Sequence, residues 1–112
     1  MKIIDLENIK IPSINRKYIL SRGRLILSDE YRIWKNYLSK SCTRKKLKGP
    51  YRIEIYIDTN KDIDNCVKLI IDAVEDAGII DDDKNITQLF ISKQHIKKGR
   101  PEKLIVLVGN PI

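Results

Sequence analysis

A strand pattern that passes directly into a helical repeat constrains the fold of this chain more than any other feature. Between residues 51 and 57, isoleucines alternate with polar or aromatic neighbours, which is the period of a half-buried strand. Between residues 64 and 77, apolar side chains recur on one helical face, and Gly78 follows as a residue suited to end a helix. We therefore predict a strand that leads into an amphipathic helix packed on a sheet.

The rest of the chain supplies further elements of both kinds. We predict strands at 2–11, 85–93 and 103–108, a hairpin across 18–27, and a helix over 29–40 with Ser28 as its N-cap. The last strand is apolar enough to be central in a sheet. In the 29–40 segment, apolar and aromatic residues follow helical spacing: Tyr31, Ile33, Trp34, Tyr37 and Leu38. We expect the three aromatic residues Tyr31, Trp34 and Tyr37 to pack in the core.

The length of the chain limits how these elements combine. A chain of 112 residues buries enough surface for one core and not for a second. We therefore predict a single domain over residues 1–112 with an α+β fold, in which a mixed β-sheet packs with two helices.

Several classes of protein are disfavoured by the sequence. No apolar run approaches the roughly 18 residues of a membrane span, and acids interrupt the first residues too early for a signal peptide. We expect an intracellular, cytoplasmic protein with no membrane partner, in which Cys42 and Cys66 are reduced thiols. Because no phosphate-binding glycine loop, dinucleotide fingerprint or Cys/His zinc spacing is present, we expect neither a nucleotide cofactor nor zinc.

The formal charge of +7 conceals a strong asymmetry. Residues 58–83 hold nine acids and two bases, a charge of −7, whereas the remaining 86 residues carry +14. A basic body of this kind suggests a polyanion as partner. Carboxylates that face a polyanion are tolerable only when cations lie between them, so the acidic window suggests a cation site.

The acids concentrate where the 51–57 strand passes into the helix. Asp62 and Asp64 lie at this junction, and carboxylate oxygens are the ligands that Mg²⁺ prefers. The helix from Asp64 to Ala77 is about 20 Å long, and an extended return over residues 78–83 covers about the same distance. We therefore expect the acids at 81–83 to arrive beside Asp62 and Asp64, with Asp83 reaching farthest back.

Lys68 stands one helical turn beyond Asp64, where it can neutralise a phosphate held at a metal. A purely structural interpretation stays open at this point, because Asp62 or Asp64 is also a good N-cap and Asp64 with Lys68 is an ordinary i, i+4 ion pair. A calcium-binding EF-hand loop is excluded, since Ile63 stands where that loop requires Gly and Leu69 where it requires Glu.

Two stretches of the sequence resemble one family, the RusA-type Holliday junction resolvases. The segment Lys61 to Lys68, followed by Asp72-Ala73-Val74 and the acidic run at 81–83, is similar to the family pattern Asp-x-Asp-Asn-x-x-Lys, Asp-Ala-Leu and Asp-Asp. Pro12-Ser13-Ile14-Asn15-Arg16, with the basic hairpin behind it, looks like the family's N-terminal segment. The two matches together span residues 12–93.

The resemblance implies a fold, a cofactor and roles for named residues. It implies that Asp62, Asp64 and one acid of the 81–83 run bind Mg²⁺, with Mn²⁺ as a substitute, and that Lys68 assists at the phosphate. Ungapped spacing from Asp62 selects Asp83 as the third ligand, with Asp82 as the alternative. The family also implies a RusA-like homodimer that cuts branched DNA at two symmetric positions of a four-way junction, as a two-fold dimer would.

Exposed basic and amide side chains near the N-terminus suit phosphate contacts that position DNA without reading its sequence. The candidates for DNA binding are Asn15, Arg16, Lys17, Arg22 and Arg24. Candidate dimer surfaces are the isoleucine-rich segment 2–11 and the 29–40 helix. The sequence thus supports a Mg²⁺-dependent, structure-selective DNA endonuclease, against the alternative of a junction-binding protein without cleavage, whose acids are structural.

Overall fold

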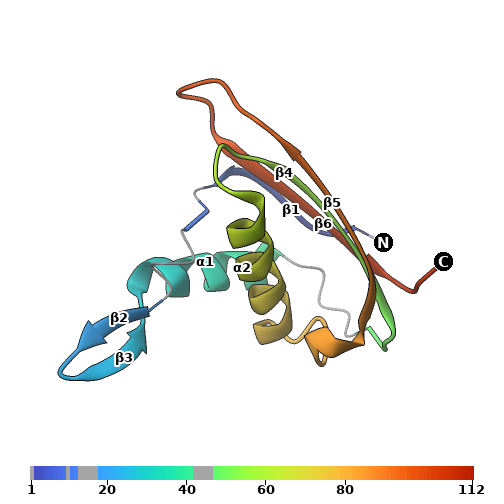
Figure 1. Cartoon of the computed structure of the whole chain (residues 1–112), viewed down its shortest axis with the longest axis horizontal. Helices are drawn as coiled ribbons and strands as arrows, with labels where there is room; N and C mark the ends of the chain where they lie inside the picture. The colour runs from blue at the N-terminus through green and yellow to red at the C-terminus, as the bar shows by residue number, and fades with distance from the viewer. Residues whose placement is uncertain (1, 10, 13–17, 42–46) are drawn as a thin grey trace.

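A mixed sheet with helices on one face forms the body of the protein (Figure 1). The computed structural model describes residues 2–9, 11–12, 18–41 and 47–112. The elements in chain order are β1 (Lys2–Ile9), β2 (Tyr18–Ser21), β3 (Arg24–Leu27), α1 (Asp29–Ser41), β4 (Tyr51–Asp58), α2 (Ile63–Asp76), the short 3₁₀ helix η2 (Asp83–Asn85), β5 (Ile86–Gln94) and β6 (Glu102–Gly109).

Four strands form the main sheet in the order β1-β6-β4-β5. β6 runs antiparallel to both β1 and β4, while β4 and β5 are parallel, so the predicted mixed sheet and its central last strand are confirmed. Parallel neighbours need a crossover connection, and α2 supplies it between β4 and β5. α2 therefore begins near the end of β4 and ends near the start of β5.

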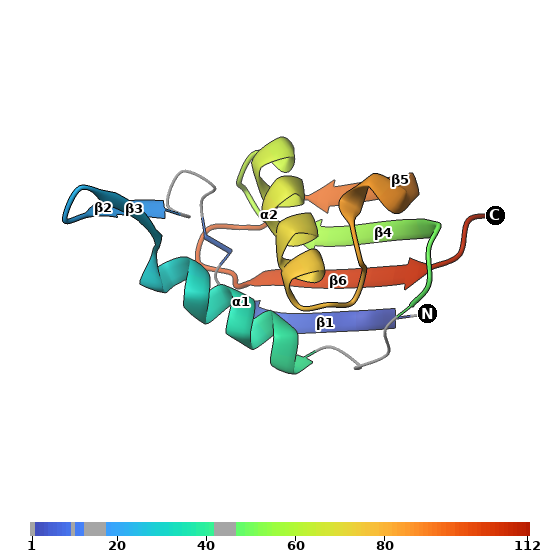
Figure 2. The same cartoon turned by 90° about the horizontal axis from the view of Figure 1, so that it is seen from below.

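The core lies between the sheet and the two helices, which cover the same face (Figure 2). Ile53, Ile55 and Ile57 of β4 are at most 1% exposed, as the alternation predicted. Burying each such side chain is worth about 1.5–3 kcal/mol. The helices contribute Tyr31, Trp34, Leu38, Cys66, Leu69, Ile70, Ala73 and Val74. The prediction is confirmed as an α+β fold with a mixed sheet and two helices.

The α1 prediction is correct in extent, but the expected core packing of Tyr37 is wrong. Ile33 is 70% exposed and Tyr37 is 50% exposed, whereas Tyr31 and Trp34 are buried. A helix buries only the stripe that faces its neighbours, and the other apolar positions of α1 fall outside that stripe.

β2 and β3 form a separate two-stranded hairpin that extends away from the sheet and helices (Figures 1 and 2). Ser21 pairs with Arg24, so only Arg22 and Gly23 form the turn. Both have positive φ, 52° and 76°, as the tightest hairpin turns require.

The chain leaves α2 through a Schellman turn. The Gly78 N–H donates to the Glu75 carbonyl at 2.9 Å and the Ile79 N–H to the Val74 carbonyl at 3.2 Å, while Gly78 has φ 76°. Ile79 and the next residue, Ile80, are then buried in the core. This turn keeps residues 79–85 close to the C-terminal end of α2, where β5 begins opposite Tyr51.

Candidate functional site

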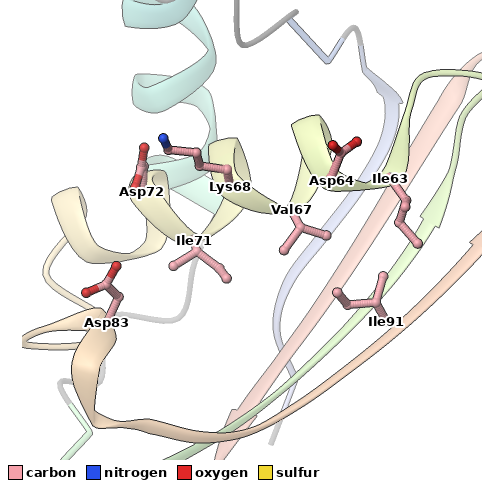
Figure 3. Close-up of a pocket in the computed structure, with 8 residues that line it drawn as sticks. All are labelled: Ile63, Asp64, Val67, Lys68, Ile71, Asp72, Asp83 and Ile91. Atoms are coloured by element: carbon pink, nitrogen blue, oxygen red, sulfur yellow. The ribbon is translucent and has the colours of Figure 1, made fainter.

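A groove of about 520 Å³ runs along the exposed side of α2 (Figure 3). Asp64, Lys68 and Asp72 come from successive turns of α2, because residues four apart share one face of a helix. Asp83 reaches the groove from η2, and the apolar lining consists of Ile63, Val67, Ile71 and Ile91. The groove thus combines three carboxylates and one ammonium group over an apolar floor.

The acids at the start of α2, Asp62 and Asp64, could serve as a helix cap or as part of an ion pair, and the described structure shows neither role. Asp62 is the N-cap residue, with extended backbone at φ −65° and ψ 135°, yet its side chain makes no capping hydrogen bond. No ion pair joins Asp64 to Lys68 within the described part of the chain. Both side chains are exposed and lie at the start of α2.

The three consecutive acids at 81–83 have three different environments. Asp81 lies 3.0 Å from Asn85 Nδ2 and 3.1 Å from the Tyr51 hydroxyl, and these hydrogen bonds, that of Asn85 first, lower its pKa. Asp82 caps η2 by accepting the Lys84 N–H at 3.0 Å, which lowers its pKa as well. Asp83 is exposed and lines the groove. Asp83 is therefore the acid of this run that a ligand in the groove can reach.

Glu75, Asp82 and Asp83 form what we call the C-terminal acid cluster. Carboxylate oxygens of the three residues lie within 4.8 Å of one another. Burial, and next the charge of Asp83, raise the pKa of Glu75. The last turn of α2 has no basic residue, so the negative end of the helix dipole adds to the repulsion. Hard carboxylate oxygens at this spacing fit a divalent cation such as Mg²⁺.

The expected convergence of Asp62 and Asp64 with the 81–83 run is wrong. Asp83 lies at the opposite end of the groove from Asp64 (Figure 3). The chain after Gly78 does not return in extended form, because Ile79 and Ile80 are buried and η2 follows at once. Asp62 and Asp64 do not belong to the cluster that holds Asp83 among the described residues.

A comparison with protein families matches residues 9–107 to the family described as Endodeoxyribonuclease RusA. The chain belongs to the RusA endodeoxyribonuclease family. This match covers most of the 112 residues and supports a nuclease that acts on DNA. A search of curated proteins found no significant match.

The structure describes two of the five residues that were predicted to bind DNA. Arg22 and Arg24 are exposed at the tip and flank of the β2–β3 hairpin, away from the helices and the sheet. Asn15, Arg16 and Lys17 lie outside the described residues. Among the described residues, no helix is long and apolar enough to cross a membrane.

The sequence prediction for this RusA chain missed Glu75 as part of an acidic cluster. Glu75 is three residues beyond Asp72 and so shares its polar helical face, which is a signal visible in the sequence. Its closeness to Asp82 and Asp83 depends on the Schellman turn that bends the chain back over the end of α2.

Proposed function

We propose that this protein is a Mg²⁺-dependent, structure-selective DNA endonuclease that resolves four-way junctions by symmetric nicking. One observation carries the proposal: Asp64, Lys68 and Asp83, which match the RusA pattern, line a single groove. The lack of a capping hydrogen bond at Asp62 and of an Asp64–Lys68 ion pair in the described structure supports it further. Carboxylates without a structural task remain available for a ligand.

The candidate residues in and beside the groove have proposed roles. Asp62, Asp64 and Asp83 are the proposed metal ligands, at the two ends of the groove: Asp62 and Asp64 at the start of α2, and Asp83 in the C-terminal acid cluster with Asp82 as an additional donor. Bound Mg²⁺, or Mn²⁺ in its place, would polarise the phosphate and lower the pKa of an attacking water. Lys68 lies between the two acidic ends of the groove, where its ammonium group stabilises charge that develops on the phosphate.

The DNA partner is expected to lie over the basic surface. The exposed Arg22 and Arg24 suit phosphate contacts, as we propose for Asn15, Arg16 and Lys17. Because the 58–83 window carries −7, metal would also reduce its repulsion of DNA. We expect this activity inside the cell, on branched DNA.

We further propose that the protein acts as a homodimer, because two opposed strands of a junction require two sites related by a two-fold axis. Two surfaces suit a second copy. β1 is an edge strand of the four-stranded sheet, and α1 exposes Ile33. Sedimentation of an Ile33→Glu variant distinguishes the two surfaces, since only a dimer through α1 should dissociate.

Two synthetic four-way junctions, one with a mobile core and one with a fixed core, test the activity. The wild-type protein should bind both with or without metal and should nick two opposed strands only when Mg²⁺ is present. Linear duplex of the same sequence is the control for structure selectivity. Binding without metal-dependent nicking would contradict the enzyme proposal and favour the junction-binding alternative, in which the acids are structural.

A further inference from the structure

We propose that Glu102 is a positioning residue that holds the backbone leading to Asp62 and Asp64 in place and ties it to the backbone of Ile11. The inference rests on the proposed function, since it assigns Glu102 a role toward the proposed metal ligands. Glu102 lies at the start of β6, far from Asp62 in the sequence, and is not one of the described residues that line the groove.

The Glu102 carboxylate is buried, with 9% of the residue exposed, and it accepts hydrogen bonds from three residues in two separate segments. One oxygen accepts the Ile11 N–H at 2.9 Å, the other accepts the Thr59 hydroxyl, and Lys61 Nζ lies 2.9 and 3.0 Å from the two oxygens. A carboxylate has about four acceptor sites, so this one is almost fully used.

The segment 59–61, which joins β4 to α2, is held from several sides by this network. Thr59 is fully buried, and its hydroxyl also accepts the Lys61 N–H at 3.2 Å. Lys93 Nζ of β5 donates to the Lys61 carbonyl. The Asn60 side chain exchanges two hydrogen bonds of 2.9 Å with the backbone of Ile96.

Asp62 follows this segment directly, so the network determines where the helix starts. The Asp62 carbonyl accepts the Cys66 N–H at 3.2 Å, and Asp64 lies within this first helical turn. The Asp62 and Asp64 side chains are exposed and make no hydrogen bond to another described residue, so their placement depends on the backbone before them. The backbone, in turn, depends on Glu102.

A role in stability alone explains this arrangement less well. The Lys61 side chain is 38% exposed, and an ion pair that is open to solvent contributes at most about 1 kcal/mol of stability. By contrast, groups that orient metal ligands from behind typically change metal affinity or activity about 10–100-fold when they are replaced. A buried carboxylate that converges on the approach to two candidate ligands fits the second role.

The contact with Ile11 extends the network to the second family motif. Ile11 is buried and directly precedes Pro12, where the segment that resembles the family's N-terminal motif begins. Glu102 therefore holds the backbone at Ile11 as well as the backbone that precedes the proposed metal ligands.

The test compares Glu102→Gln with Glu7→Gln, a matched change at an exposed glutamate that pairs with Lys103 at 3.4 Å. Glu102→Gln should raise the Mg²⁺ concentration for half-maximal nicking by about tenfold or more, with thermal stability and affinity for the junction in EDTA close to wild type. In metal-free protein, amide hydrogen exchange should accelerate at Lys61 and Ile11 and stay unchanged at Ile55 in β4. Glu7→Gln should match wild type throughout.

The outcomes separate this inference from the proposed function. If Glu102→Gln keeps both the wild-type Mg²⁺ requirement and the wild-type exchange at Lys61, the positioning role is overturned. If wild-type protein itself does not nick, the proposed function fails, while the exchange measurement still decides whether Glu102 holds the segment. Should Glu102→Gln not fold, Lys61→Gln and Lys61→Arg decide: loss in the first and recovery in the second support the role, and wild-type behaviour of both overturns it.

Discussion

The two ends of α2 carry the same kind of charge in opposite settings. Asp62 and Asp64 at the start are exposed, lie at the positive end of the helix dipole and make no side-chain hydrogen bond or ion pair with the described residues. Glu75 at the other end is close to Asp82 and Asp83, in a last turn without any base. Acids favour the first setting and are repelled in the second.

The difference between the two ends of α2 indicates which acids depend on a bound cation. Carboxylates at the start of a helix are stable whether or not a ligand is present, so their use in metal binding does not trade against folding. The C-terminal acid cluster gains more from a cation, because a bound ion would remove repulsion within the folded protein. Function should therefore be most sensitive to the first end, and stability to the second.

The largest effect is expected from Asp64→Asn. Removing the charge of a proposed metal ligand should reduce junction nicking at least about 10³-fold, because such a ligand supports several kcal/mol of transition-state stabilisation. Junction affinity in EDTA should stay the same or improve, because one negative charge near the DNA is lost. Nicking of a labelled junction and gel-shift titration measure the two quantities.

Asp76→Asn is the matched control for that variant, on the same helix. Asp76 accepts the Tyr31 hydroxyl at 3.2 Å and pairs with Lys35 at 3.8 Å, both structural contacts outside the groove. It should nick at the wild-type rate with a stability loss of about 1 kcal/mol or less. Equal loss of nicking in the two variants, or joint loss of binding and folding in Asp64→Asn, would contradict a special role for the start of α2.

Local sequence patterns predicted the elements well, and the reason lies in particular residues. The isoleucines of β4 and the apolar face that ends at Gly78 define a strand and a helix without knowledge of any partner. The placement of Asp83 depended instead on the path of six residues. An extended return and a Schellman turn are equally compatible with Gly78, and only the burial of Ile79 and Ile80 decides between them.

The hydrogen-bond network of Glu102 could not be predicted from the sequence, for a similar physical reason. Its donors come from residues 11, 59 and 61, and they meet Glu102 only because β6 pairs with both β1 and β4. Strand order depends on the packing of the whole sheet. A single acid at the start of an apolar strand carries no local sign of that order.

A smaller effect is expected from Tyr51→Phe, near the turn that follows the C-terminal end of α2. The buried Tyr51 hydroxyl lies 2.8 Å from the Leu47 carbonyl and 3.1 Å from the Asp81 carboxylate. Tyr51→Phe should lower the free energy of unfolding by about 1–2 kcal/mol, since the hydrogen bonds of the buried hydroxyl to Leu47 and Asp81 are lost. Urea unfolding measures this change, and junction nicking at 25 °C should remain within about threefold of wild type. A large loss of nicking with unchanged stability would mean that the second end matters for chemistry more than for the fold.

The smallest effect, and the one that compares the two ends most directly, is expected from Glu75→Gln. Because the pKa of Glu75 is raised above its ordinary value of 4.5, the folded protein binds this proton more tightly than the unfolded chain does. Stability therefore falls as pH rises from about 4.5 through the raised pKa, and at pH 7 the ionised group opposes folding. In EDTA at low salt and pH 7, Glu75→Gln should be more stable than wild type by about 0.3–1 kcal/mol, with no gain below pH 4.

At the other end of the same helix, Asp64→Asn should change stability in the opposite direction. It removes a negative charge that the helix dipole stabilises, so the variant should be slightly less stable than wild type under the same conditions. Saturating Mg²⁺ should stabilise wild type more than Glu75→Gln, because an ion that binds only the folded state adds stability in proportion to its affinity. Thermal melts of the three proteins at pH 4 and pH 7, with EDTA and with Mg²⁺, measure all of these differences. A loss of stability in Glu75→Gln at pH 7 in EDTA would show that the acid cluster is held by protein contacts alone, and that the two ends of α2 do not differ in their need for a cation.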